Sequence, residues 1–189
     1  MIDKINNNLY ENRYDKGYKW LHWLMAVLVI LMFMATFGFA QAETDAEKME
    51  MLVGHSSMGT LIFILFVIRF SKRFIAISPR PTHDISPMNS MAAKVGHLAL
   101  YLLLFIVPVT GYLTASTHEL PVFLFGQINL VEFNGHNKIS FEMLRGFHEL
   151  AVQTLMVFVA LHISAAAFHG LFKKDGVFSS MWPKRQSKI

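Results

Sequence analysis

Histidine is the residue type in this 189-residue chain best suited to binding a transition metal. The chain has nine histidines and no cysteine, which excludes disulfides, thiolate-bound zinc or iron–sulfur clusters and covalent attachment of a c-type haem. Several histidines fall in or at the ends of long apolar stretches, where a polar side chain is costly and indicates a function. They are His22, His55, His97, His148 and His162, with His169 close to the last stretch.

Two of these histidines, His148 and His162, are fourteen residues apart, which is close to four turns of an α-helix. At about 100° per residue they point within roughly 40° of one another, about 21 Å apart along the axis. Two imidazoles at that distance cannot bind one metal ion, but they suit two cofactors stacked along one helix face. The alternative is that histidines only hydrogen-bond between helices. It explains one isolated histidine better than it explains four, His22, His55, His148 and His162, whose depths in the membrane match in pairs, as argued from the crossing directions below.

Composition indicates that the helices carrying these histidines cross a membrane. Hydrophobic residues make up 53% of the chain and the mean hydropathy is +0.39, which is unusual for a soluble protein. A bilayer core about 30 Å thick requires roughly 20 apolar residues in a helix. Stretches of about that length occur at residues 20–40, 52–70, 95–115 and 148–172. We predict an all-α membrane protein, a four-transmembrane-helix up-and-down bundle, with residues 1–189 as a single domain.

The charges between these stretches alternate in sign. The first segment, the second connection and the tail are basic, with Lys4, Arg13, Lys16, Lys19, Lys72, Arg73, Arg80, Lys94, Lys173, Lys174, Lys184, Arg185 and Lys188. The other two connections are mainly acidic, with Glu43, Asp45, Glu47, Lys48, Glu50, Glu119, Glu132, Lys138, Glu142 and Arg145. The positive-inside rule then makes both termini cytoplasmic. The net charge of +4 reflects membrane topology, and no nucleic-acid partner is expected.

Three segments allow further expectations. Ala40-Gln41-Ala42 resembles a signal-peptidase site, but the preceding apolar stretch is too long for a signal peptide and contains His22, so we predict a retained span. Pro108 is expected to kink the third helix or to release a backbone carbonyl. The connection of about residues 116–147 is too long for a turn, and we expect it to cap the outer end of the bundle with a short interfacial helix.

Depth in the membrane assigns partners to the histidines, because the chain crosses in alternating directions. His22 begins the first stretch at the cytoplasmic level, which matches His162. His55 begins the second stretch at the outer level, which matches His148. One histidine pair in each leaflet supplies the two axial ligands that a b-type haem needs.

The assignment of His162 stays open on depth alone, since His97 and His169 also lie at the cytoplasmic level and either could replace it as the inner ligand. As non-ligands, they are expected to serve a haem propionate, a quinone or proton uptake, because imidazole changes charge near neutral pH. The histidines in predicted loops are expected on the surface; they are His83, His118 and His136.

Two residues of the second stretch extend the haem interpretation. Gly59 lies one turn after His55, where the missing side chain lets a flat macrocycle approach the backbone. Arg69 lies fourteen residues after His55, hence on the same side at the cytoplasmic level. There it could pair with a haem propionate, or it could snorkel towards the surface.

From Tyr14 to Lys184 the sequence resembles the bacterial cytochrome b561 family of the inner membrane, and more distantly the dihaem cytochrome b subunits of hydrogenases and formate dehydrogenases. The residues that carry the resemblance are Trp20-Leu21-His22-Trp23, His55 with Gly59 and Arg69, Gly96-His97-Leu98 through Leu104-Phe105 with Pro108 and Gly111, Phe147-His148-Glu149, and Leu161-His162 through His169. The resemblance implies two haem b groups, one held by His22 with His162 and one by His55 with His148. It also implies electron exchange between a quinone pool and a partner at the outer face, and some members are described as oxidising superoxide.

Three functions are compatible with these residues. The first is a quinone-linked oxidoreductase of the respiratory chain in a bacterial inner membrane. It could take electrons from superoxide, for which Lys and Arg near an exposed haem edge would attract the anion. The second is a haem-carrying anchor subunit of a periplasmic dehydrogenase. The third is a histidine-lined transporter of protons or metal ions, which needs histidines at one depth and is opposed by the fourteen-residue spacing.

Overall fold

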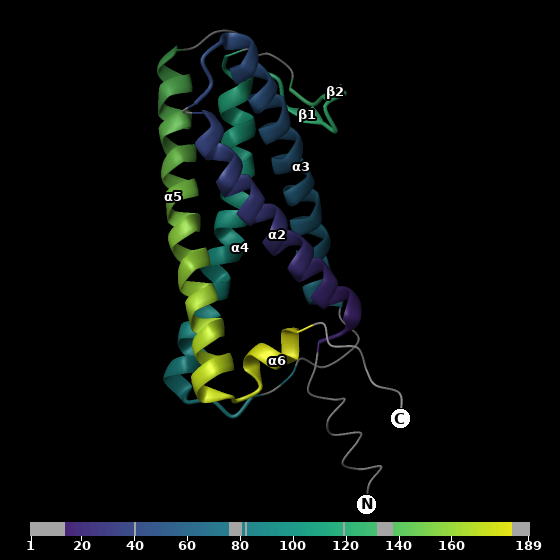
Figure 1. Ribbon diagram of the computed structural model, residues 1–189, viewed down its shortest axis with the longest axis vertical. Helices are drawn as coiled ribbons and strands as arrows, with labels where there is room; N and C mark the ends of the chain where they lie inside the picture. The colour runs from purple at the N-terminus through teal and green to yellow at the C-terminus, as the bar shows by residue number, and fades with distance from the viewer. Residues whose placement is uncertain are drawn as a thin grey trace, which may run out of the picture.

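Four long helices form the bundle in the computed structural model, which describes residues 14–39, 41–75, 81, 83–118, 120–131 and 138–182 (Figure 1). They are α2 (Lys16–Phe39), α3 (Asp45–Ile75), α4 (Pro87–Ser116) and α5 (Lys138–Phe168). The π-helical turn η1 (His169–Lys173) and the short helix α6 (Val177–Met181) follow α5. Residues discussed above that lie outside the described part are Lys4, Arg13, Ala40, Arg80, Glu119, Glu132, His136, Lys184, Arg185 and Lys188.

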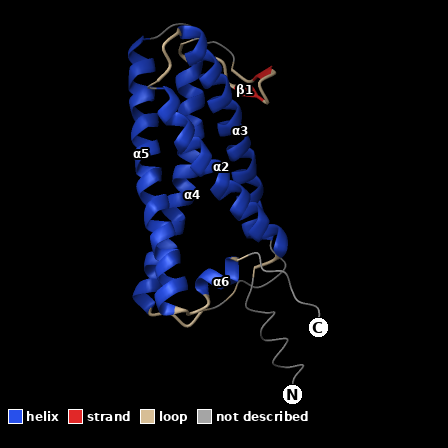
Figure 2. Cartoon of the chain, in the orientation of Figure 1, coloured by secondary structure: helices blue, strands red, loops and turns tan. Residues whose placement is uncertain are grey.

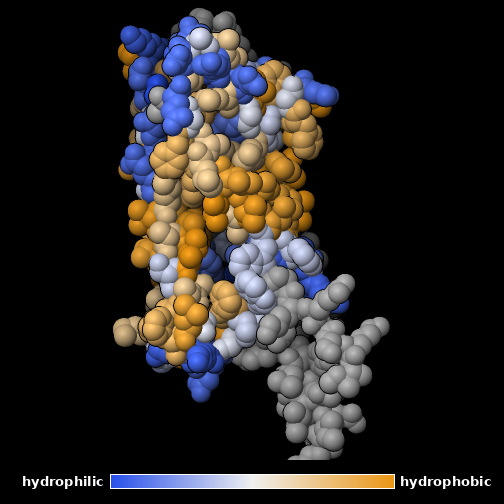
Figure 3. Space-filling view, in the orientation of Figure 1, coloured by the Kyte–Doolittle hydropathy of each residue, from blue (hydrophilic) through white to orange (hydrophobic). Residues whose placement is uncertain are grey.

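All four long helices are long and apolar enough to cross a membrane. Only 6 to 17% of the residues in their most apolar windows are buried inside the molecule, so most of these apolar side chains stay at least partly exposed, as expected for helices surrounded by lipid. Figure 3 shows a broad hydrophobic band across the middle of the helices, with polar residues gathered beyond it. The protein is therefore an integral membrane protein, and the predicted four-helix fold is confirmed.

Polar caps set where two of the helices begin. Before α3, Thr44 and Glu47 form a reciprocal capping box, in which Glu47 Oε2 accepts from the Thr44 N–H at 3.1 Å and Thr44 Oγ1 accepts from the Glu47 N–H at 3.2 Å. Before α4, the Ser86 side chain caps the helix and Pro87 occupies its first turn. Because these caps lie outside the apolar stretches, both helices begin earlier than the predicted spans.

The bundle consists of two helix pairs. Helix α2 packs mainly along α3, and α4 packs along most of α5, while α3 and α4 share a smaller contact. Successive helices run in opposite directions, which gives the predicted up-and-down topology (Figure 1). Helix α6 packs against η1 and the end of α5.

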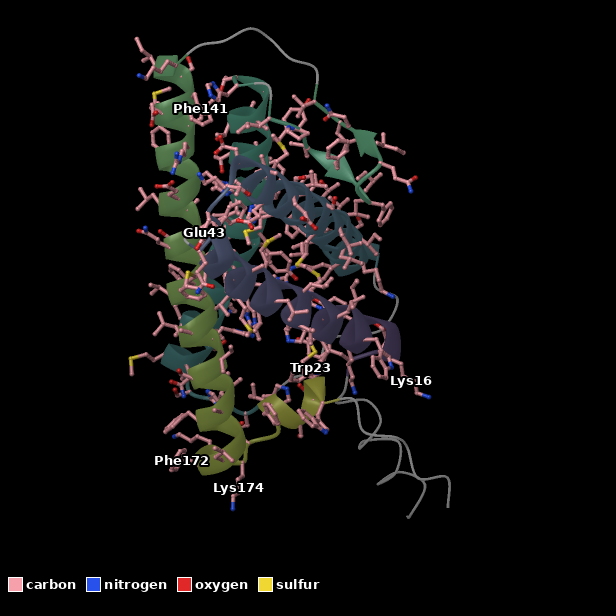
Figure 4. All side chains as sticks on the ribbon, turned by 45° about the horizontal axis from the view of Figure 1, so that its top comes forward. Lys16, Trp23, Glu43, Phe141, Phe172 and Lys174 are labelled. Carbon is pink, nitrogen blue, oxygen red and sulfur yellow. The ribbon has the colours of Figure 1, made fainter. Side chains whose placement is uncertain are left out.

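The up-and-down course separates the charges of the described residues. We call one end the basic end, which holds Lys16, Lys19, Lys72, Arg73, Lys94, Lys173 and Lys174. The opposite end is the acidic end, with Glu43, Asp45, Glu47, Glu50, Glu142 and Glu149 beside Lys48, Lys138 and Arg145. In Figure 4, Lys16 and Lys174 lie towards the basic end, and Glu43 and Phe141 towards the acidic end.

The described part of the connection between α4 and α5 carries a small β-hairpin (Figure 2). Strand β1 (Phe123–Leu124) pairs antiparallel with β2 (Ile128–Asn129). The expected interfacial helix is thus wrong for these residues. The reason is local, because Phe125 and Gly126 have φ values of 54° and 69°, a left-handed conformation that closes a hairpin and cannot continue a right-handed helix.

The hairpin is tied to α3 by two serine side chains. Ser56 Oγ accepts from the N–H of Phe123 at 3.2 Å, and Ser57 Oγ accepts from the N–H of Gly126 at 3.0 Å. Both serines directly follow His55. The described hairpin therefore lies against α3 directly beside His55, towards the acidic end of the bundle.

Candidate functional site

Two pairs of histidine rings face one another between the helix pairs. Near the acidic end, His55 on α3 faces His148 on α5, with ring centres 6.3 Å apart and ring planes at 79°. Near the basic end, His22 on α2 faces His162 on α5, with ring centres 6.2 Å apart and ring planes at 84°. Helix α5 thus contributes one ring to each pair, and the α2–α3 pair contributes the other.

These separations fit two imidazoles that bind one iron from opposite sides. A ring nitrogen bonds a transition metal at about 2.0–2.1 Å and lies about 1.1 Å from the centre of its ring, so trans ligands place their ring centres about 6.3 Å apart. Nδ1 of His55 is also buried without a hydrogen-bond partner in the described residues, an exception that needs an explanation in a folded protein. The side chains present therefore fit an iron porphyrin held between the members of each pair.

The ring of His148 is held by α4. Its Nδ1 lies 3.0 Å from the carbonyl oxygen of Val107 and 3.2 Å from Thr110 Oγ1. Gly111 leaves room for this approach, because a Cβ there would lie 3.1 Å from His148 Cε1. Pro108 lies inside α4 without interrupting it. The carbonyl of the preceding residue, Val107, accepts a hydrogen bond from Thr110 Oγ1. Sequence reasoning did not identify Val107 or Thr110, since the backbone acceptor of Val107 has no signature in residue type and the Thr110 side chain reaches His148 only through the packing of α4 on α5.

The two alternatives to His162 have other neighbours. His97 on α4 lies beside His162 with ring centres 5.4 Å apart, which is shorter than the separation expected across an iron, and its side chain is exposed. His169 Nδ1 lies 2.5 Å from Asp175 Oδ2 in the turn that follows α5. The ring that faces His22 is therefore that of His162.

Asp175 contacts residues on both sides of the turn between η1 and α6. Its Oδ1 accepts a hydrogen bond from the N–H of Val177 at 3.2 Å, while Oδ2 meets His169. Partial burial acts to raise the pKa of the Asp175 carboxyl, but these hydrogen bonds outweigh it and hold the pKa below its usual range. The carboxylate therefore links the end of α5 to the start of α6.

Gly59 and Arg69 both lie on α3. Gly59 is one turn after His55, and Arg69 is near the basic end, beside the first turn of α2. A Cβ on Gly59 would meet Met32 Cε at 3.6 Å, an ordinary contact with a flexible side chain. Arg69 donates to the carbonyl oxygen of Tyr18 at 3.2 Å, and its guanidinium lies 4.2 Å from the centre of the Tyr18 ring. Since Tyr18 is one turn before His22, Arg69 fixes the first turn of α2 beside the basic-end pair.

The C-terminal segment covers the basic end beside His22. Trp23 donates from Nε1 to the carbonyl oxygen of Met181 at 3.0 Å, and its ring packs against Trp182 with centres 5.3 Å apart. Figure 4 shows Trp23 next to α6. Phe178 lies over Gly170, where a Cβ would come within 3.0 Å of the Phe178 ring. These contacts join α6 and Trp182 to Trp23, whose ring lies 5.8 Å from that of His22.

The loop histidines differ in their surroundings. His118 is exposed, as expected, and stacks on Phe141 with ring centres 4.4 Å apart. His83 is half-buried, because it lies against the turn at Gly176, where a Cβ would be 3.6 Å from His83 Nδ1. In the described part of the chain, no group of three or more His, Asp or Glu side chains could hold a metal ion.

Histidine rings from different membrane-spanning helices face each other in two pairs. This arrangement is typical of the class of membrane cytochromes b. The family model described as prokaryotic cytochrome b561 matches residues 13–184, and the chain belongs to this family. It is 30% identical over 167 residues to cytochrome b561 homolog 2 of Escherichia coli (strain K12), which covers 88% of this chain and 89% of that protein. It is 28% identical over 168 residues to the probable superoxide oxidase CybB of Yersinia pestis, covering 88% and 93%. The protein is thus a bacterial integral membrane protein that carries b-type haem and transfers electrons within the membrane.

Proposed function

We propose that this protein passes electrons between a membrane quinone and a partner at the outer face of the bacterial inner membrane, by way of two b-type haems in one domain of residues 1–189. In this proposal His22 and His162 would hold one haem, and His55 and His148 would hold the other. The observation that carries the proposal is the spacing of the two pairs. Their ring centres are 6.2 and 6.3 Å apart, which is the separation that two imidazoles have across one iron.

The orientation follows from the charges. Membrane proteins retain Lys and Arg on the cytoplasmic side, so the basic end is the inner end and the acidic end faces the periplasm. The pair His22–His162 then lies near the cytoplasmic surface and His55–His148 near the outer surface. Both termini are cytoplasmic in this orientation.

The haem supplies one-electron iron chemistry when it is bound. The chain contributes its position and its surroundings. His148 and His162 are carried fourteen residues apart on α5, so the two histidines that would hold the haems are separated by about 21 Å along one helix. Apolar side chains around them exclude water, which lowers the local dielectric and affects the reduction potential.

The basic end has the groups that a quinone site needs. A quinone that accepts two electrons also takes up two protons, so it requires hydrogen-bond donors and a proton source near the membrane surface. His97, exposed beside His162, is suited to bond a quinone oxygen or a propionate. His169 with Asp175 is suited to deliver protons. Replacing His97 by Ala without any change in haem or quinone turnover would remove it from this site.

Superoxide oxidation is a second candidate, favoured by the similarity to the probable superoxide oxidase CybB. The charges at the acidic end argue against a fast reaction with this anion. Arg145 is paired with Glu149 at 2.8 Å and Lys48 with Asp45 at 3.3 Å. Among the other charged residues described at this end, the carboxylates Glu43, Glu47, Glu50 and Glu142 outnumber the one cation, Lys138. An acidic surface repels superoxide, so a different outer partner is the first candidate. Copurification with a periplasmic dehydrogenase would favour the anchor-subunit alternative.

The test is a haem count on the purified protein. We expect two haem b per chain, measured by a reduced-minus-oxidised visible spectrum and a haem-to-protein ratio. His22→Ala or His162→Ala should remove one haem, and His55→Ala or His148→Ala the other. His118→Ala, which changes an exposed histidine stacked on Phe141, is the matched control and should keep both. A protein without haem, or four ligand variants with the full complement, would contradict the proposal.

A further inference from the structure

The two histidines near the acidic end are held unequally. Nδ1 of His148 lies 3.0 Å from the Val107 carbonyl oxygen and 3.2 Å from Thr110 Oγ1. Nδ1 of His55, on the opposite side, is buried without a partner in the described residues. The protein therefore fixes one ring of this pair through α4 and leaves the other ring to be oriented by its surroundings.

The contacts of Thr110 define which nitrogen of His148 carries the proton. Thr110 Oγ1 lies 2.9 Å from the carbonyl oxygen of Ile106 and 3.0 Å from that of Val107. A hydroxyl has one hydrogen, and these carbonyls take it, so towards His148 the Thr110 oxygen can only accept. The Val107 carbonyl can only accept as well. Both contacts require a hydrogen on Nδ1, which leaves the lone pair of Nε2 available for iron.

The approach of the His148 ring to α4 depends on Gly111. A Cβ at this position would lie 3.1 Å from His148 Cε1 and 3.3 Å from Nδ1. Both distances are shorter than ordinary van der Waals contacts between carbon and a ring atom. Gly111 is one turn after Val107 and therefore on the same face of α4. Any larger residue here would push the ring away from the Val107 carbonyl.

We propose that Gly111, the Val107 carbonyl and Thr110 form a positioning element that orients His148 and strengthens it as a donor to the outer haem iron. The inference rests on the proposed function, because it takes His148 to be an axial ligand. A hydrogen bond from Nδ1–H to a carbonyl makes Nε2 more basic. A more basic axial ligand stabilises ferric over ferrous iron, so this element lowers the reduction potential of the outer haem.

The experiment compares Gly111→Ala with Gly146→Ala in the haem-loaded, full-length protein. Gly146 is an exposed glycine on α5 with nothing within 4 Å of an added Cβ, so its variant controls for the substitution itself. In Gly111→Ala we expect the potential of one haem to rise, with a several-fold shift of its ferric-to-ferrous equilibrium; a tenfold shift corresponds to about 59 mV for one electron. The ferric EPR signal of the same haem should move as well. Thr110→Val should raise the same potential by a smaller amount.

The outcomes separate the inference from the proposed function. Unchanged potentials and EPR signals in Gly111→Ala overturn the positioning element, while loss of one haem in His148→Ala still supports the ligand assignment. Full retention of both haems in His148→Ala overturns the ligand assignment and the inference together. If Gly111→Ala binds no outer haem, the Thr110→Val potential decides. An unchanged value there overturns the inference, and a raised value supports it.

Discussion

The ring planes of the opposed histidines are nearly perpendicular, at 79° and 84°. In ferric iron with two axial imidazoles, perpendicular planes leave two d orbitals close in energy, whereas parallel planes separate them. We therefore predict strongly anisotropic low-spin EPR signals from both haems of the oxidised protein. Low-temperature EPR measures this directly. Rhombic signals, as given by parallel rings, would contradict the ring orientations.

Arg69 is predicted to stabilise the bundle through Tyr18. Its hydrogen bond to the Tyr18 carbonyl and its position over the Tyr18 ring join α3 to the first turn of α2. Arg69→Gln should lower the free energy of unfolding by about 1–3 kcal/mol, measured as thermal loss of the haem spectrum. Lys72→Gln is the control, since Lys72 makes an exposed ion pair with Asp15 at 3.6 Å, and such pairs contribute about 0–1 kcal/mol. Equal losses in both variants would refute this function of Arg69.

At the scale of the elements, the apolar stretches predicted the centres of the helices and missed their ends. The bilayer needs only about 20 apolar residues, but α3 and α5 each run for 31 residues, because both continue into polar residues outside their apolar stretches. The hairpin was missed for a related reason. It depends on the left-handed conformation of Phe125 next to Gly126, and phenylalanine gives no indication of such a turn.

The sequence predicted which histidines face each other, but not which groups hold their rings in place. Alternating crossing directions place His22 and His162 at one depth and His55 and His148 at another, and the structure brings these rings together. Their use as haem ligands stays a prediction. The partners of His148 and Arg69 could not be predicted. Each includes a backbone carbonyl, of Val107 and of Tyr18, whose position depends on how α4 and α2 pack.

The turn between η1 and α6 is predicted to open at acidic pH. Hydrogen bonds hold the pKa of Asp175 below its usual range, so the carboxylate stabilises the turn above the ordinary carboxyl pKa of about 4, and this is lost as the pH falls through the lower folded value. Asp175→Asn should produce the same opening at neutral pH. Hydrogen–deuterium exchange over residues 177–182 measures it, with the exposed Asp84→Asn as control. Equal protection in Asp175→Asn and the unchanged protein would be evidence against the link.

At the scale of the whole molecule, the separation of charges predicts how superoxide would react. The acidic end should repel the anion, and salt screens that repulsion. The rate of haem reduction by superoxide should therefore rise with ionic strength, and Glu50→Gln with Glu142→Gln should raise it at low salt. Rapid-mixing spectroscopy measures both effects. A rate that falls with salt would instead indicate attraction by basic residues and make superoxide the first candidate.

The division of the bundle into two helix pairs has a consequence for biogenesis. The pairs α2–α3 and α4–α5 are each made of neighbours in the chain, so each can form as a hairpin soon after insertion, because local contacts form fastest. The opposed histidines come from different hairpins, so they meet only when the hairpins dock. Binding of haem would then hold the α2–α3 and α4–α5 hairpins together after their separate insertion. A polypeptide divided between α3 and α4 should still reassemble around the haem.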